Sequence, residues 1–252
     1  MARIGPLTIS FAALSSALLM VTAMPALADT DKVPPGDPCG SGPGVGKGNP
    51  CNGNNGNEGA NGNARSGQPE FQEIELPPSE DTGVFISQIG TTNRAEADQG
   101  NNRSFTRIAQ NGGENTADVT QGASGTHYAS IGQTGDANKV VALQEGSGQT
   151  VLLLAQQGDN NTAAIAQTDG GQRYSAAAVM QNGNGNSLIL VQDGDDNQAR
   201  LTQSGDDNIM TASQIDNGNR LEWNQIGNGL SDLGIEQTGG STVQITQSRP
   251  GG

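Results

Sequence analysis

From residue 84 onward, short runs of alternating apolar and polar residues recur along the chain, and a glutamine closes each run. Nine of the fourteen intervals between these glutamines are 11 residues and three are 12. A polar chain of low complexity does not hold such a register by chance, so we interpret the pattern as an internal repeat. The repeat glutamines are Gln88, Gln99, Gln110, Gln121, Gln133, Gln144, Gln156, Gln167, Gln181, Gln192, Gln203, Gln214, Gln225, Gln237 and Gln247.

The residues two and four positions before each glutamine are apolar, and only Thr106 departs from this rule. The last two units follow it with Leu233 and Ile235 and with Val243 and Ile245. Intervening positions are often polar or charged. Alternation with a period of two is typical of a strand with one buried face. Each unit is therefore predicted to be a strand of about five residues with its glutamine on the inward face.

Glycine and asparagine follow the strands, and both tolerate the positive φ that a sharp reversal requires. The turn glycines are Gly90, Gly112, Gly135, Gly158, Gly183, Gly194, Gly205 and Gly227. The turn asparagines are Asn93, Asn115, Asn138, Asn161, Asn186, Asn197, Asn208 and Asn219. Two strand–turn units make one rung of about 22 residues, and rungs stacked at ~4.8 Å form a solenoid. We predict an all-β solenoid of about seven rungs with two facing parallel sheets over residues 83–252, with the three extra residues between Gln167 and Gln181 in a bulged loop.

Buried glutamines need partners, because an unpaired buried amide costs a few kcal/mol. In a stack in register, each amide donates to the glutamine of the next rung, and the turn asparagines form similar ladders. Both ends of such a ladder stay open, and so do the backbone groups of the end rungs. We expect no cap after the last strand, so the open ends favour head-to-tail stacking of copies.

The first 28 residues have the features of a secretory signal peptide. Arg3 is their only charge, an apolar stretch follows, and small residues precede a cleavage site after Ala28. A membrane anchor is the alternative, although Pro25 would interrupt it. No later apolar stretch is long enough to span a bilayer. We therefore expect an exported chain that is soluble or assembles outside the cell.

Residues 29–82 are rich in proline, glycine and asparagine and are predicted to form a flexible linker. Cys39 and Cys51 are the two cysteines of the chain, and in an oxidising compartment they either form a small disulfide loop or remain idle thiols. Residues 71–76 alternate like a strand before Pro77. They are either a docking segment or an adhesive piece of the linker.

The composition limits the function. Hydrophobic residues make up 32% of the chain and aromatic residues 3%, too few for a conventional core but suitable for a narrow solenoid interior. A net charge of −14 with scattered basic residues excludes nucleic acid as a partner. His127 is the single histidine and is interpreted as a solvated strand-edge residue. We predict no enzyme, no cofactor, no metal site and no small-molecule substrate.

The units resemble the curlin repeat, which reads Ser-x5-Gln-x-Gly-x2-Asn-x-Ala-x3-Gln, although the leading serine is mostly missing. Four stretches carry its Gln, Gly, Asn, Ala and Gln positions: Gln88–Gln99, Gln110–Gln121, Gln156–Gln167 and Gln192–Gln203. The likeness extends over about residues 84–247, and the signal peptide and linker match the layout of a curlin precursor. Curlin is the subunit of curli, which are functional amyloid fibres.

The resemblance implies export to the periplasm, unfolded passage through a curli-type outer-membrane pore and assembly into extracellular fibres for adhesion and biofilm. The linker would carry the pore-recognition signal, and the partners would be copies of the chain and a related nucleator. The chain itself is either a major subunit or a minor, nucleating one. A monomeric calcium-binding β-roll, indicated by the Gly-Asp-x-Asn turns, and a monomeric surface-binding solenoid are the competing interpretations.

Two features bear on assembly. Aspartates crowd the turns and either slow fibre growth by repulsion or simply favour solvated turns; they are Asp136, Asp159, Asp195, Asp196, Asp206 and Asp207. Six outward positions are apolar, namely Val141, Leu143, Leu153, Met180, Ile189 and Val191. They form either a patch that joins fibres or contacts a nucleator, or a merely apolar outer face.

Overall fold

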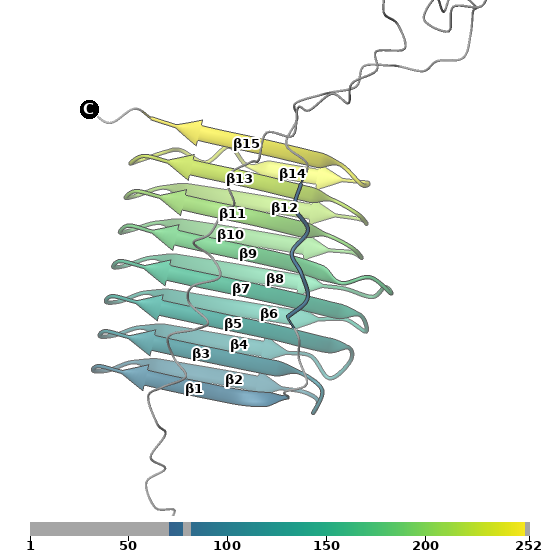
Figure 1. Ribbon diagram of the computed structural model, residues 1–252, viewed down its shortest axis with the longest axis horizontal. Coiled ribbons are helices and arrows are strands. Elements are labelled where there is room, and N and C mark those ends of the chain that lie inside the picture. The colour runs from purple at the N-terminus through teal and green to yellow at the C-terminus, as the bar shows by residue number, and fades with distance from the viewer. Residues whose placement is uncertain (1–70, 78–81, 250–252) are drawn as a thin grey trace, which may run out of the picture. The chain divides into compact units, whose positions relative to one another are not determined.

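The computed structural model describes residues 71–77 and 82–249. Fifteen strands follow one another along residues 83–248, and each pair of consecutive strands forms one rung of a solenoid (Figure 1). The strands are β1 Gly83–Ile89, β2 Arg94–Gln99, β3 Phe105–Asn111, β4 Thr116–Gln121, β5 Thr126–Thr134, β6 Lys139–Glu145, β7 Gln149–Gln157, β8 Thr162–Thr168, β9 Ser175–Asn182, β10 Ser187–Asp193, β11 Gln198–Ser204, β12 Ile209–Ile215, β13 Arg220–Ile226, β14 Ile235–Thr238 and β15 Thr242–Ser248.

Odd- and even-numbered strands form two separate parallel sheets. The eight odd strands make sheet 1, and the seven even strands make sheet 2. Every pairing places glutamine beside glutamine, as Gln88 beside Gln110 in sheet 1 and Gln99 beside Gln121 in sheet 2. The predicted solenoid with two facing parallel sheets is therefore confirmed, and the extra residues of the long interval lie in the loop between β8 and β9.

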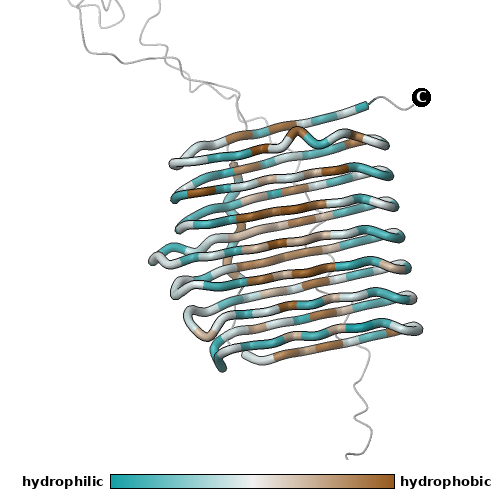
Figure 2. Tube along the Cα trace, turned by 180° about the vertical axis from the view of Figure 1, so that it is seen from behind, coloured by the Kyte–Doolittle hydropathy of each residue, from teal (hydrophilic) through white to brown (hydrophobic). Residues whose placement is uncertain are grey.

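The core lies between the two sheets and consists of the inward apolar pairs. They form one continuous cluster from Ile108 to Trp223, and Trp223 has no exposed surface. The first rung is open, because Val84 and Ile86 remain 41% and 43% exposed. Figure 2 shows hydrophobic stretches in the middle of the strands and hydrophilic turns at both edges. The gap between two sheets holds only two layers of side chains, which explains how a chain with few large apolar residues forms a core.

The prediction for Leu233 is wrong. Its side chain is 50% exposed, because residues 227–234 are not part of a strand and β14 has only four residues. Leu230 is buried in this segment instead, at 7% exposure. The carboxylate of Asp232 accepts the backbone N–H of Thr211 and that of Gly234, both at 2.9 Å, so a side chain takes the place of strand pairing before β14.

Residues 71–77, here called the strap, pack on the outer face of sheet 1 and cross its strands (Figure 1). Ile74 is 2% exposed and clusters with Val151 and Ala176. Its backbone N–H donates to Oε1 of Gln198 at 2.8 Å, and the hydroxyl of Tyr174 donates to its carbonyl at 2.8 Å. The strap is therefore a docking segment on sheet 1 and not an adhesive piece of the linker.

Charged side chains extend the strap contact toward the later rungs. The guanidinium of Arg200 donates to the carbonyls of Gln72 and Glu73 at 2.9 and 3.2 Å. Arg220 forms ion pairs with Glu73 at 3.3 Å and with Asp196 at 2.7 Å. The strap thus spans β7 to β13, and the folded unit begins before residue 83.

The predicted signal peptide, Cys39, Cys51 and most of the predicted linker lie outside the described residues. Within the described ranges, no helix is long and apolar enough to cross a membrane.

Candidate functional site: stacked amide ladders

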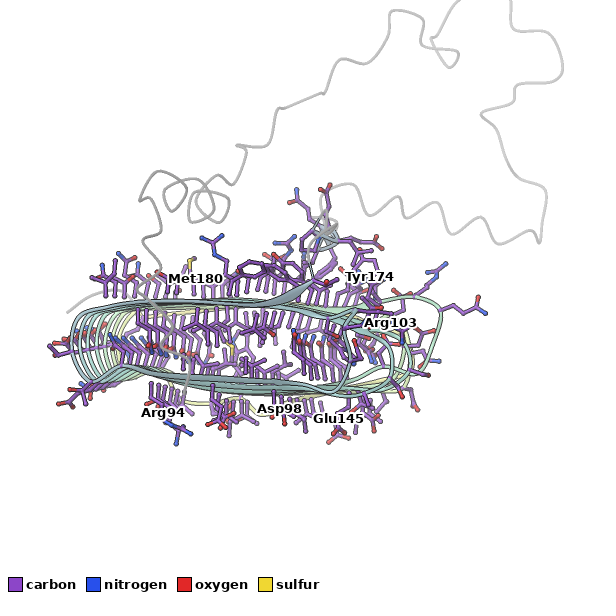
Figure 3. The ribbon with its side chains drawn as sticks, turned by 90° about the horizontal axis from the view of Figure 1, so that it is seen from below. Arg94, Asp98, Arg103, Glu145, Tyr174 and Met180 are labelled. Carbon is purple, nitrogen blue, oxygen red and sulfur yellow. The ribbon has the colours of Figure 1, made fainter. Side chains whose placement is uncertain are left out.

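The inward glutamines form two continuous hydrogen-bonded ladders along the solenoid axis. In sheet 1 the Nε2 of each glutamine donates to Oε1 of the next at 2.6–2.9 Å, through Gln88, Gln110, Gln133, Gln156, Gln181, Gln203, Gln225 and Gln247. In sheet 2 the corresponding distances are 2.7–3.0 Å, through Gln99, Gln121, Gln144, Gln167, Gln192, Gln214 and Gln237. Figure 3 looks along the stack and shows rows of side chains filling the space between the two sheets.

The second N–H of these amides ties the two sheets together. Gln156 of sheet 1 donates to the carbonyl of Lys139 in sheet 2 at 3.2 Å, and Gln167 of sheet 2 donates to the carbonyl of Val151 in sheet 1 at 3.0 Å. An interior glutamine thereby uses both amide hydrogens and its carbonyl oxygen. Thr106, the polar exception among the inward pairs, donates its hydroxyl to Oε1 of Gln121 at 2.9 Å. Burial of this many polar groups is tolerated because they are hydrogen-bonded.

Both ladders run in one direction, with every Nε2 pointing toward the C-terminal end. Among the described residues, nothing donates to Oε1 of Gln88 or Gln99, so the N-terminal end face presents two free acceptors. At the other end, Nε2 of Gln247 donates only to the carbonyl of Ser231, whereas Nε2 of the buried Gln237 donates to the carbonyl of Arg220 in the other sheet and to the carbonyl of Ser241. The C-terminal end face therefore presents a free amide hydrogen on Gln247, whereas both amide hydrogens of Gln237 are used within the chain.

Asparagines form a third ladder in the turns that lead from odd to even strands, through Asn93, Asn115, Asn138, Asn161, Asn186 and Asn208. Oδ1 of Asn138, for example, accepts the backbone N–H and the Nδ2 of Asn161, both at 3.0 Å. Nδ2 of Asn161 also donates to the carbonyl of Gly183 at 2.8 Å. The asparagines therefore hold each turn against the turn of the next rung.

Asn197 and Asn219 belong to a different column, in the turns that lead from even to odd strands. This column is mixed and runs through Ser104, His127, Thr150, Ser175, Asn197, Asn219 and Ser241. Sequence reasoning did not find its serine, threonine and histidine members. A usable signal was present, because every member lies six residues before a repeat glutamine, as the asparagines of the other column do.

The interpretation of His127 as a solvated residue is wrong. Its side chain has no exposed surface; Nδ1 lies 2.9 Å from Oγ1 of Thr150 and Nε2 lies 2.8 Å from the carbonyl of Ser124. Burial lowers the pKa of this imidazole, although the hydrogen bond to Ser124 and the charge of Glu145 act in the opposite direction. His127 is thus a neutral member of the turn column with a structural place in it.

The eight turn glycines all have positive φ, between 109° and 126°. Their second constraint is space: a Cβ on Gly158 would lie 2.2 Å from the carbonyl oxygen of Gly183 in the next rung. The same approach recurs along the column, so any larger residue would push two rungs apart. Glycine is required here by both the backbone conformation and the close stacking of turns.

Two buried polar atoms of the described residues have no hydrogen-bond partner, Oδ2 of Asp169 and Nδ2 of Asn208. Asp169 lies in the long loop between β8 and β9, and burial raises the pKa of its carboxyl. Asn208 faces residues 227–234, where Leu230 takes the position of the next asparagine and donates its backbone N–H to Oδ1 of Asn208 at 3.0 Å. Both atoms therefore mark interruptions of the repeat.

The turn aspartates contact the neighbouring rungs. Oδ1 of Asp136 accepts the backbone N–H of Gly113 at 2.6 Å, and Oδ1 of Asp159 accepts that of Asp136 at 2.8 Å. Asp206 does the same for Asn184 at 2.8 Å. These carboxylates satisfy turn donors, a role that neither sequence interpretation included.

The six outward apolar residues do not form one patch. Val141, Leu143, Ile189 and Val191 lie on β6 and β10 of sheet 2, whereas Leu153 and Met180 lie on β7 and β9 of sheet 1. Figure 3 shows Met180 and Tyr174 outside one sheet, and Asp98 and Glu145 outside the other. Consecutive units alternate between the sheets, so a set drawn from odd and even strands is divided between opposite faces.

No group of three or more His, Cys, Asp or Glu side chains within the described ranges is arranged to hold a metal ion.

The family model of the curlin associated repeat matches residues 183–215, which cover the region from the end of β9 to the end of β12. The chain therefore carries a curlin repeat, as the sequence pattern indicated. No curated protein and no solved structure matches the chain.

Proposed function

We propose that this chain is a secreted structural subunit that stacks head to tail into an extracellular, curli-like amyloid fibre. The curlin associated repeat at residues 183–215 and the parallel solenoid support a structural role in place of a catalytic one. Export through the N-terminal signal, passage through a curli-type outer-membrane pore, adhesion and incorporation into a biofilm matrix are parts of the same proposal. A related nucleator subunit is the proposed second partner.

The observation that carries the proposal is the complementarity of the two end faces. The N-terminal face presents the free acceptors of Gln88 and Gln99, and the C-terminal face presents a free donor on Gln247 and, beside it, Gln237, which donates to the carbonyl of Ser241 in the single chain. The edge strands also carry unpaired backbone groups, which act as a template for another strand. A copy that docks end to end continues both ladders, and each docking leaves a new face of the same kind.

Apolar inward residues at the N-terminal face would be buried by the same contact. Val84 and Ile86 of β1 are 41% and 43% exposed, although the matching positions of the interior rungs are fully covered. Each such side chain gains up to about 1–2 kcal/mol on burial. The contact between end faces therefore combines the backbone ladder, the glutamine ladders and an apolar centre, as every interior rung does.

A pair of substitutions on β1 tests this proposal. Ile86 points toward the core side of the end face, and its neighbour Phe85 points outward and is 51% exposed. Neither side chain is fully buried in the single chain, so a lysine at either position leaves the fold intact. Elongation of sonicated seeds by Ile86→Lys is expected to be at least tenfold slower than by the unsubstituted chain, whereas Phe85→Lys elongates within about twofold of it. Equal elongation by both variants would refute stacking through the end face.

A further inference from the structure

The two ends of the solenoid are stepped, because the sheets contain unequal numbers of strands. Sheet 1 ends with β15, and sheet 2 ends one position earlier with β14. At the other end, β1 lies in sheet 1 and begins the first rung. A second copy can therefore be placed on the C-terminal end face in two ways.

In the first arrangement the incoming copy keeps the orientation of its neighbour. Its β1 then pairs with β15 in sheet 1, and its β2 falls two positions beyond β14 in sheet 2. One strand position in sheet 2 stays empty. The ladder of sheet 2 is broken there, because Gln237 has no glutamine above it, and the upper edge of β14 keeps its unpaired backbone groups.

In the second arrangement the incoming copy is turned by half a turn about the stacking axis. Its β1 pairs with β14, its β2 pairs with β15, and no position is empty. Gln247 then donates to Gln99 of the incoming copy, and Gln237 exchanges its hydrogen bond to the carbonyl of Ser241 for one to Gln88. We infer that successive subunits of the fibre are related by about half a turn, an inference that rests on the proposed function.

The interchange of sheets is possible because both sheets repeat the same unit. Every strand brings a glutamine to the same register position, whichever sheet it lies in. The turns fit as well, since Asn93 of the rotated copy lies above Ser241 in the mixed column. An asparagine stacked above a serine already occurs inside the solenoid, where the backbone N–H of Asn197 donates to Oγ of Ser175 at 3.1 Å.

The half turn has two consequences for the fibre. Fifteen strands at two per rung give a rise of 7.5 rungs per subunit, about 36 Å at ~4.8 Å per rung. The strap lies on sheet 1 alone, so straps alternate between opposite sides of the fibre. Without the rotation, each subunit would occupy eight rung positions, and all straps would lie on one side.

Helical reconstruction from electron cryomicroscopy of fibres grown from residues 29–252 tests the inference. The expected symmetry is a rise of 7.5 strand spacings with a rotation near half a turn, to which the solenoid twist adds. A rotation near zero with a rise of eight spacings would overturn the inference and leave the proposed function intact. Failure of the chain to form any fibre would overturn the proposed function itself.

Two length variants make the test independent of one reconstruction. A second copy of residues 198–208, which contain β11 and its turn, adds one strand and gives the sheets eight strands each. Fibres of this variant are expected to lose the half turn. Duplication of residues 187–208, which contain β10 and β11, adds a whole rung and is expected to retain it. The same rotation in both variants would contradict the inference.

Discussion

Replacement of Gln156 by alanine is the sharpest test of the ladder within one chain. Gln156 accepts from Nε2 of Gln133 at 2.8 Å and donates to Oε1 of Gln181 at 2.7 Å and to the carbonyl of Lys139 at 3.2 Å. Alanine leaves a buried N–H on Gln133 and a buried carbonyl on Gln181 without their partners. Each unsatisfied buried group costs about 1–3 kcal/mol, so we expect Gln156→Ala to lower the free energy of unfolding by about 3–5 kcal/mol.

The adjacent Gln157 provides the control, since it has the same side chain on the same strand but is exposed. Gln157→Ala is expected to change the free energy of unfolding by less than about 0.5 kcal/mol. Urea unfolding at nanomolar concentration can be followed by the fluorescence of Trp223, the single tryptophan of the chain. Equal midpoints for the two variants would refute the claim that the ladder stabilises the solenoid.

Three further predictions concern the turns. Asn161→Ala is expected to destabilise the chain in urea by at least about 1 kcal/mol more than Asn208→Ala, because the Nδ2 of Asn208 is already unpaired; equal losses would contradict the ladder. Gly158→Ala is expected to lower the midpoint of thermal unfolding, because its Cβ would push two rungs apart. Gly170→Ala, whose Cβ would meet no atom within 4 Å, is expected to leave that midpoint unchanged. The pKa of His127 is lower in the folded chain than in the unfolded chain, so the unfolded chain takes up a proton at a higher pH. The free energy of unfolding is therefore expected to fall as the pH drops below about 6.5. If the urea midpoint of His127→Asn shows the same fall with pH, His127 is not its cause.

The solenoid could be predicted from sequence because its information is local and repeated. The glutamine period and the alternation before it determine which face of each strand is buried, and parallel stacking then brings like residues together. The same register contains the mixed turn column, since His127 and Ser175 lie six residues before Gln133 and Gln181. His127 was interpreted as solvated because it is the single histidine of an acidic chain, and its position six residues before Gln133 was not considered.

Other features depend on contacts that no period encodes. Ile74 is the one buried residue of the strap, and its backbone partner Gln198 lies 124 positions away in the sequence. The prediction for Leu233 is wrong because the side chain of Asp232 accepts the backbone N–H of Thr211 and β14 begins only at Ile235. The division of Val141 and Leu153 between opposite faces could have been predicted from the order of the units, because consecutive units lie in different sheets.

Electron microscopy combined with fibre diffraction tests the central claim of head-to-tail stacking most directly. Residues 29–252 are purified from denaturant and left at micromolar concentration in the presence of a chelator. We expect unbranched fibres with a meridional reflection at ~4.8 Å, which would also exclude calcium as a requirement for folding. A stable, folded monomer that never polymerises would contradict the claim and indicate a solenoid that binds another partner.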